Sequence, residues 1–152
     1  MYLPKETFAG IVAHAPLISI DLIVRNAAGE VLLGKRRNRP AQGFWFVPGG
    51  RVRKDETLDA AFIRLTETEL GQAVRREQAD FLGVYEHFYA DNFSGTDFST
   101  HYVVMAYQLS LPTSGQLPQE QHAAYVWFSP EKLLAEELVH ANSKAYFMKQ
   151  HA

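Results

Sequence analysis

The segment from Gly49 to Gly71, GGRVRKDETLDAAFIRLTETELG, constrains the fold of this chain more than any other stretch. A glycine pair and a basic loop lead into a run whose apolar side chains recur at i, i+3, i+4 and i+7, namely Leu58, Ala61, Phe62 and Leu65. This spacing predicts an amphipathic helix from Thr57 to Leu70, and Gly71 stands where a helix commonly ends. Glycines, a basic loop and a glutamate before a helix are typical of enzymes that handle phosphate groups.

Strand-like segments stand on both sides of this helix. Before it, residues 17–24 and 31–36 are rich in β-branched and apolar residues and flank a turn at Gly29, which predicts an antiparallel pair. The aromatic run FWFVPGG predicts a short strand that Pro48 and two glycines stop. After the helix, three more segments are expected to form strands: FLGVYEHFYA, THYVVMAYQLSL and AAYVWFS.

The C-terminal part predicts a further helical region. Ser129 suits an N-cap, and Pro130 follows at the first helical position. We expect this region to be broken near Asn142 and Ser143. Strands before and after one well-marked helix, with another helix at the end, predict an α+β fold in which a mixed β-sheet lies between α-helices. The length of 152 residues suits a single domain over residues 1–152.

The composition excludes several classes of site. The chain has no cysteine, so disulfides, thiolate metal sites and a cysteine nucleophile are absent. With 15 Lys+Arg against 17 Asp+Glu, the net charge of -2 gives no strong positive field for a nucleic-acid polymer. Lys5, Glu6 and Pro16 interrupt the apolar residues of the N-terminus, which therefore suits neither a signal peptide nor a membrane span. We expect a cytoplasmic enzyme.

The central segment resembles the Nudix box, a motif with a glycine, a glutamate, an arginine, a glutamate pair and a final glycine at fixed spacing. The residues at the matching positions are Gly50, Glu56, Arg64, Glu69 and Gly71. The upstream runs VLLGKR and FWFVPGG are also typical of Nudix domains. An acid like Glu69, considered alone, is more often an ordinary surface charge, but the joint match favours a Nudix fold with a metal site.

Two acids of that motif are missing. Leu65 stands in place of the glutamate after the arginine, Thr68 replaces the first glutamate of the later pair, and Gln72 ends the box. Glu67 cannot substitute for them because it lies roughly 200° around the helix from Glu69. Alternatively, Leu65 only extends the apolar stripe and Thr68 only faces solvent.

The remaining acids suit one metal ion better than a cluster. Glu69 is the clear candidate, with Glu56 as an assisting carboxylate. A single Mg²⁺ commonly needs one or two carboxylates together with water and substrate phosphates. Attack on phosphorus assisted by several metal ions is therefore disfavoured.

The whole chain resembles the GDP-mannose mannosyl hydrolase branch of the Nudix family, whose box lacks the same acids. The segments that carry this resemblance are LLGKR, NRPAQG, FWFVPGGRV, HFYADNFSGTDFSTHYVV, LPQEQH and VHANSKAYF. The resemblance implies Mg²⁺-dependent hydrolysis of GDP-mannose, and also of GDP-glucose, to GDP and free sugar. Water is then expected to attack the anomeric carbon with inversion, so the enzyme must stabilise a leaving diphosphate.

The resemblance also implies the groups that act on the diphosphate. One Mg²⁺, for which Mn²⁺ can substitute, is expected at the metal ligands, which are the Gly49 carbonyl, Glu69 and Gln121. Arg36 and Arg51 are the expected cations, and Tyr102 is the expected hydrogen-bond donor to the leaving group. His122 corresponds to the general base, although a lone histidine in a loop is more often an exposed bystander.

The expected substrate contacts come from three parts of the sequence. Asp21 and His87 are assigned to the sugar by resemblance, and Arg36 also contacts substrate. By pattern alone, Asp21 could equally face outward from its strand and His87 could belong to an aromatic patch. The N-terminal candidates for the guanosine are Tyr2, Leu3 and Phe8, which belong either to the same subunit or to the partner in a homodimer; alternatively they are terminal packing.

Two other functions remain open at this point. One is a conventional Nudix pyrophosphohydrolase that attacks phosphorus of a nucleotide sugar, with a carboxylate elsewhere in the chain completing a metal cluster. The other is a non-catalytic module that binds a nucleotide sugar. The glycine-containing loop from Asp91 to Thr100 is expected to be a flexible element near the site.

Overall fold

The computed structural model describes residues 3–111, 117 and 122–148, without the side chains of residues 122 and 123. The helices are α1 (Lys5–His14), α2 (Leu58–Leu70), α3 (Pro130–Ala135) and α4 (Ala141–Lys144), with 3₁₀ helices η1 (Arg76–Gln78) and η2 (Ala145–Phe147). The strands are β1 (Leu17–Arg25), β2 (Val31–Arg36), β3 (Trp45–Phe46), β4 (Gly49–Arg51), β5 (Asp80–Tyr89), β6 (Thr100–Ser110) and β7 (His122–Phe128). No helix within these residues is long and apolar enough to cross a membrane.

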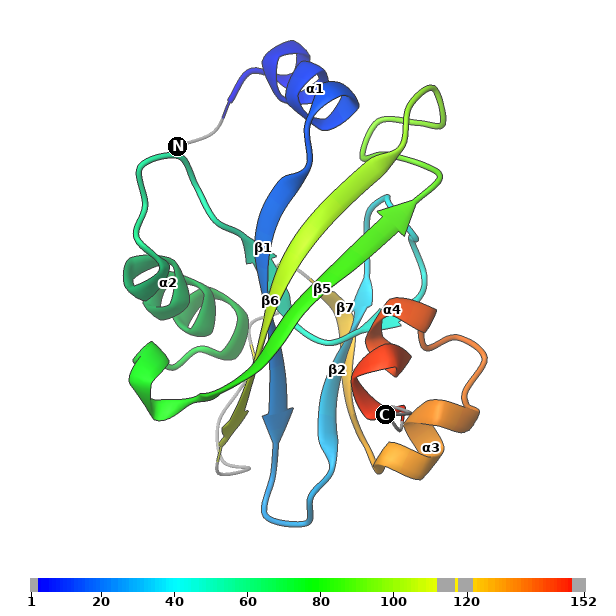
Figure 1. The fold of residues 1–152 in the computed structure, drawn as a ribbon. Coiled ribbons are helices and arrows are strands. Elements are labelled where there is room, and N and C mark those ends of the chain that lie inside the picture. The colour runs from blue at the N-terminus through cyan, green and yellow to red at the C-terminus, as the bar shows by residue number, and fades with distance from the viewer. Residues whose placement is uncertain (1–2, 112–116, 118–121, 149–152) are drawn as a thin grey trace.

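The strands form one mixed sheet of seven strands. Its main path is β3-β2-β1-β6-β5, with β4 also paired to β1 and β7 also paired to β2. β1 and β6 run parallel, whereas the other pairs are antiparallel. Figure 1 shows α2 on one side of this sheet and α3 and α4 on the other. The predicted α+β fold, with a mixed sheet between helices, is therefore confirmed.

The predicted antiparallel pair β1–β2 forms, but the two strands separate soon after their turn. Their register gives only the Arg25–Val31 pair. Farther along, β4 pairs with residues Ser19 to Asp21 of β1, while β3 and β7 pair with β2. This separation brings β4 and the far end of β2 around the middle of β1, where the candidate site lies.

Each face of the sheet has its own apolar core because both faces are covered by other elements. Along β1, Ile20, Leu22 and Val24 join α2, whereas Ile23 joins the cluster that contains Leu133 of α3. This alternation follows the two-residue period of a strand. It explains why the β1 sequence is almost continuously apolar.

The long helix α2 has the predicted ends. Thr57 is the N-cap, and its hydroxyl oxygen accepts a hydrogen bond from the Ala60 amide at 3.1 Å. Gly71 ends the helix in the left-handed conformation, with φ of 75°. Leu65 is buried in the core, at 3% exposed, whereas Thr68 is exposed.

Two terminal regions differ from the sequence-based expectations. Helix α1 was not predicted, and its Phe8 ring packs at 5.0 Å from the ring of Phe93. The expected break near Asn142 and Ser143 is wrong, since both residues lie inside α4. The break falls instead between α3 and α4, over residues 136–140. His140 accounts for the new start because its Nδ1 accepts a hydrogen bond from the Asn142 amide.

Candidate active site

A polar pocket opens where β1, β4 and the end of β2 meet. Its lining residues are Ser19, Asp21, Arg36, Arg37, Asn38, Phe46, Val47, Gly49, Gly50, Arg51, Glu69, His87, Tyr89 and Tyr102. The predicted site residues that it brings together are Asp21, Arg36, Gly49, Arg51, Glu69, His87 and Tyr102. Its volume of about 230 Å³ is below the roughly 300–1,000 Å³ of complete ligand pockets, so it suits part of a nucleotide sugar.

The glycine pair is required by close packing on the wall formed by β4 and α2. A Cβ atom on Gly49 would lie 2.3 Å from the carbonyl oxygen of Ile20, and one on Gly50 would lie 2.4 Å from Cδ2 of Leu65. Leu65 thus packs directly beneath β4. The side chain that replaces the missing glutamate is therefore part of the core, and Glu69, which is 5% exposed, is the acid that α2 presents to the pocket.

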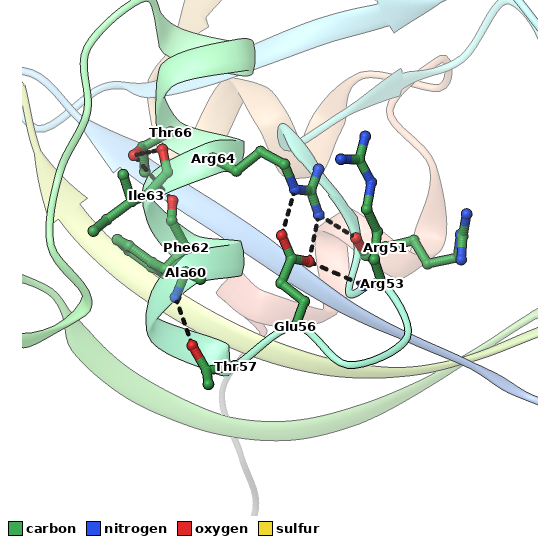
Figure 2. Close-up of polar contacts among 9 residues, drawn as sticks. All are labelled: Arg51, Arg53, Glu56, Thr57, Ala60, Phe62, Ile63, Arg64 and Thr66. Atoms are coloured by element: carbon green, nitrogen blue, oxygen red, sulfur yellow. Dashed lines mark hydrogen bonds and ion pairs between the residues drawn. The ribbon is translucent and has the colours of Figure 1, made fainter. Parts of the chain in front are cut away.

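The other two charged residues of the box motif form an ion pair behind this wall (Figure 2). Arg64 donates hydrogen bonds to both carboxylate oxygens of Glu56, at 2.7 and 2.9 Å, and to the carbonyl oxygen of Arg51 at 2.8 Å. Glu56 also accepts a bond from the Arg53 amide at 3.0 Å. The hydrogen bonds of Arg64 lower the pKa of Glu56 to about 2. Glu56 therefore fixes the position of the Arg51 segment. It is not among the residues that line the pocket, and its assistance to a metal stays a prediction.

Two guanidinium groups face the pocket from different strands. Arg36, at the end of β2, lies 5.5 Å from the ring centre of Phe46. Arg51, at the end of β4, lies 5.0 Å from the ring centre of Phe8. Burial raises the pKa of Tyr102, which keeps its hydroxyl protonated as a donor. The pocket thus combines two cations and a neutral donor, a set that suits the oxygens of a diphosphate.

The opposite wall contains a hydrogen-bonded group of three side chains. The Tyr146 hydroxyl donates to Oδ2 of Asp21 at 2.5 Å and lies 3.3 Å from Nε2 of His87. Burial raises the pKa of Asp21 to about 7 and, together with the charge of His140, lowers the pKa of His87 to about 4. His87 is therefore neutral near neutral pH. Asp21 does not face outward, because it lies on the sheet face that the C-terminal helices cover.

The remaining predicted site residues are not brought to the pocket in the same way. Leu3 precedes α1 and is not among the residues that line the pocket. Phe8 is not among them either, but its ring contacts the guanidinium group of Arg51, which lines the pocket. His122 begins β7, where its backbone pairs with Arg36, a lining residue. Tyr2 and Gln121 lie outside the described residues, as does the side chain of His122.

The loop from Asp91 to Thr100 is built around a buried side chain and does not line the pocket. Asn92 is 0% exposed. Its side-chain Nδ2 donates to the carbonyl oxygen of Phe98 at 2.8 Å, and its side-chain Oδ1 accepts from the Ser94 backbone amide at 2.8 Å. The loop therefore has hydrogen bonds of its own, and its expected flexibility stays a prediction.

Sequence reasoning missed several residues of the site. Arg37 and Asn38 line the pocket; Asn38 begins the NRPAQG run and Arg37 stands directly before it. Tyr89 follows His87 by two positions on β5. Tyr146 stands behind the pocket and belongs to the VHANSKAYF segment. The segments NRPAQG, HFYADNFSGTDFSTHYVV and VHANSKAYF carry the resemblance to the GDP-mannose mannosyl hydrolase branch. A sequence motif does not show which side chains lie together in the folded protein.

The described donors fit one oxygen-coordinated metal ion better than a cluster. Within the described part of the chain, no three His, Asp or Glu side chains gather into a metal-binding group. The buried Glu69 carboxylate and the backbone of Gly49 both line the pocket. A hard cation such as Mg²⁺ takes few protein ligands and completes its shell with water and phosphate oxygens, so this donor set suits it.

Comparisons with known proteins agree with this architecture. The low-salt glycan biosynthesis protein Agl8 of Haloferax volcanii is 43% identical over 129 residues, covering 84% of this chain and 80% of that protein. The CTP pyrophosphohydrolase of Escherichia coli is 28% identical over 133 residues, covering 83% and 86%. The MutT protein of Methanosarcina mazei Go1 superimposes with a TM-score of 0.71 at 26% identity, covering 88% and 92%. Residues 15–150 match the NUDIX domain, and the chain belongs to the Nudix hydrolase family.

Proposed function

We propose that this Nudix hydrolase cleaves GDP-mannose, and also GDP-glucose, to GDP and free sugar through attack of water on the anomeric carbon. The observation that carries the proposal is that α2 presents a single carboxylate, Glu69, to the pocket. The positions of the two missing acids hold Leu65, which is in the core, and Thr68, which is exposed. A wall with one carboxylate suits stabilisation of a leaving diphosphate better than metal-assisted attack on phosphorus.

The side chains on the two walls of the pocket suit the two halves of such a substrate, the diphosphate and the sugar. Arg36 and Arg51 would bind the diphosphate oxygens, and the protonated Tyr102 hydroxyl would donate to the leaving group. Asp21 and the neutral His87 would bind sugar hydroxyls at the opposite wall. The relative from Haloferax volcanii is named for glycan biosynthesis, which supports a sugar-containing substrate.

A bound Mg²⁺ would supply Lewis acidity to the diphosphate, with Glu69, the Gly49 carbonyl and Gln121 as its ligands. Cleavage at carbon also requires a group that removes a proton from the attacking water. We assign this to His122, because the pairing of its backbone with Arg36 starts β7 beside the pocket. The ordinary pKa of an imidazole, about 6.5, suits a general base near neutral pH.

The position of oxygen incorporation tests this proposal directly. The purified protein is incubated with GDP-mannose and Mg²⁺ in ¹⁸O-water, and the products are analysed by mass spectrometry. We expect the label in mannose and unlabelled GDP. Label in GMP or mannose phosphate would instead show attack at phosphorus, as the similarity to the CTP pyrophosphohydrolase of Escherichia coli would favour. Saturable binding without product would show a binding module.

We also propose that the protein is a homodimer. Among the described strands, β5 stands at one end of the sheet path and pairs only with β6. It carries exposed large apolar side chains, with Phe81 56%, Val84 62% and Phe88 63% exposed. An exposed apolar edge favours association with another chain. Analytical ultracentrifugation should give twice the monomer mass of 17.2 kDa, and a monomer at micromolar concentration would contradict this.

A further inference from the structure

Tyr146 connects the two proposed sugar-binding side chains although it does not line the pocket. Its hydroxyl lies 2.5 Å from Oδ2 of Asp21 on β1 and 3.3 Å from Nε2 of His87 on β5. The aromatic ring of Tyr85 packs edge-on against the Tyr146 ring, with 4.6 Å between ring centres. Three segments that are far apart in the sequence therefore meet at one hydroxyl group.

The hydroxyl has one proton, so the direction of one hydrogen bond determines the other. Tyr146 donates its hydroxyl proton to Oδ2 of Asp21 across 2.5 Å, which lies within the roughly 2.5–3.0 Å of O–H···O hydrogen bonds. The Tyr146 hydroxyl can therefore only accept from His87. His87 must then carry its proton on Nε2, and its other ring nitrogen, Nδ1, is an acceptor.

We propose that Tyr146 is a positioning residue that holds both Asp21 and His87 as hydrogen-bond acceptors, so that this wall selects substrates whose sugar hydroxyls donate to it. The choice of a sugar rests on the proposed function, whereas the hydrogen-bond chain from His87 through Tyr146 to Asp21 does not. The lowered pKa of His87 agrees with the neutral ring that the chain requires.

The tautomer of His87 tests the chain without any substrate. We would record long-range ¹H–¹⁵N correlation spectra of the wild-type protein at pH 8.5 in EDTA, with His87 assigned by the His87→Gln variant. We expect the pattern of a neutral ring protonated at Nε2. A ring protonated at Nδ1 would overturn the proposal, because Tyr146 would then donate to His87 and not to Asp21.

The Tyr146→Phe variant tests whether the tyrosine imposes this arrangement. It removes the hydroxyl and leaves the ring, so we expect His87 to become a mixture of both neutral tautomers. Tyr85→Phe is the matched control, because it changes the adjacent ring while the Tyr146 hydroxyl remains, and its spectrum should equal that of the wild type. An unchanged His87 tautomer in folded Tyr146→Phe would overturn the positioning role. The wild-type spectrum remains decisive if that variant does not fold.

Fluorinated substrates test the consequence for specificity. In a deoxyfluoro analogue of GDP-mannose, fluorine replaces a hydroxyl and cannot donate a hydrogen bond. We expect the analogue fluorinated at the recognised position to have a KM about tenfold higher than GDP-mannose with the wild type, since acceptors would be left without donors. In Tyr146→Phe this ratio should fall toward one, while the affinity for GDP stays unchanged.

The two readouts separate failure of the inference from failure of the proposed function. Equal discrimination against the analogues by wild type and Tyr146→Phe would overturn the specificity role. If GDP-mannose is not cleaved at all, the preference for GDP-mannose over the fluorinated analogue is measured by competition for binding. The tautomer of His87 still decides whether the hydrogen bonds from His87 through Tyr146 to Asp21 exist.

Discussion

The two walls of the pocket are built in opposite ways. On the β4–α2 wall, Arg64 bonds to Glu56 and Arg51, which are 8 and 13 positions away in the sequence. On the opposite wall, Tyr146 bonds to Asp21 and approaches His87 across 125 and 59 positions. The contiguous motif thus mainly builds and braces a wall, whereas the groups suited to a particular substrate converge from distant segments.

The largest expected effect on stability comes from restoring the acid next to Arg64. Leu65→Glu would place a carboxylate in the core, against the position of Gly50. We expect the free energy of unfolding to fall by about 4 kcal/mol without metal, since an apolar side chain is lost and a charge is buried without a partner. Urea denaturation measures this. Leu65→Met is the matched control, with an expected loss below about 1.5 kcal/mol.

A stable Leu65→Glu protein that binds additional Mg²⁺ would contradict the contrast drawn between the two walls of the pocket. It would mean that this wall retains room for a metal cluster and that its packing is not specialised.

The second effect concerns the acid that remains. Glu69→Gln keeps the shape of the side chain and removes its charge, so we expect kcat to fall roughly 10²–10³-fold, as for other groups that stabilise charge in a transition state. The apparent affinity for Mg²⁺ should fall too, with little change in the melting temperature. Exposed Glu67→Gln is the matched control on the same helix and should retain wild-type activity. Equal activity of both variants would remove Glu69 from the metal site.

These expectations show which parts of the molecule the sequence could predict. The apolar period, Thr57 and Gly71 located α2 because helix ends depend on local hydrogen bonds and backbone conformation. The spacing of the box also placed Leu65 and Glu69 on one helix face. Local physics was sufficient there, since every partner lies within one segment.

The opposite wall could not be predicted in this way. Tyr146 reaches Asp21 only because the chain after α3 turns back over the sheet, and that turn begins at the cap formed by His140. Pattern alone left Asp21 undecided between an outward and a buried position, because its strand is covered on both faces. Convergence of this kind depends on tertiary packing, which residue spacing does not encode.

The third effect tests the ion pair behind the β4–α2 wall. Arg64→Ala removes both bonds to Glu56 and the bond to the Arg51 carbonyl, which leaves a largely buried carboxylate without its main partner. We expect a loss of about 3 kcal/mol in the free energy of unfolding. Arg64→Lys should recover part of it, because lysine keeps the charge but not the planar fork. Full stability with lost activity would indicate that Arg64 acts on substrate.

The fourth effect is a pH dependence of stability on the same wall. The folded-state pKa of Glu56 is about 2, below the value of 4.5 for a free glutamate. The folded state therefore binds this proton less readily than the unfolded chain. The stabilisation is complete well above pH 4.5 and is lost as the pH falls toward 2. The difference in pKa corresponds to about 3 kcal/mol, which solvent screening of this incompletely buried pair reduces to about 2 kcal/mol. Chemical denaturation across this range should show the loss in the wild type and a smaller loss in Glu56→Gln.

The smallest effect comes from restoring the other missing acid. Thr68 is exposed on α2, so Thr68→Glu should change the free energy of unfolding by less than about 0.5 kcal/mol. The substitution also places a carboxylate beside Glu69, within the same helix turn. If the pocket were merely a cluster site that had lost an acid, this variant would bind Mg²⁺ more tightly and release GMP from GDP-mannose. We expect unchanged products, because Leu65 still fills the position of the other ligand, so that the β4–α2 wall still lacks a carboxylate there.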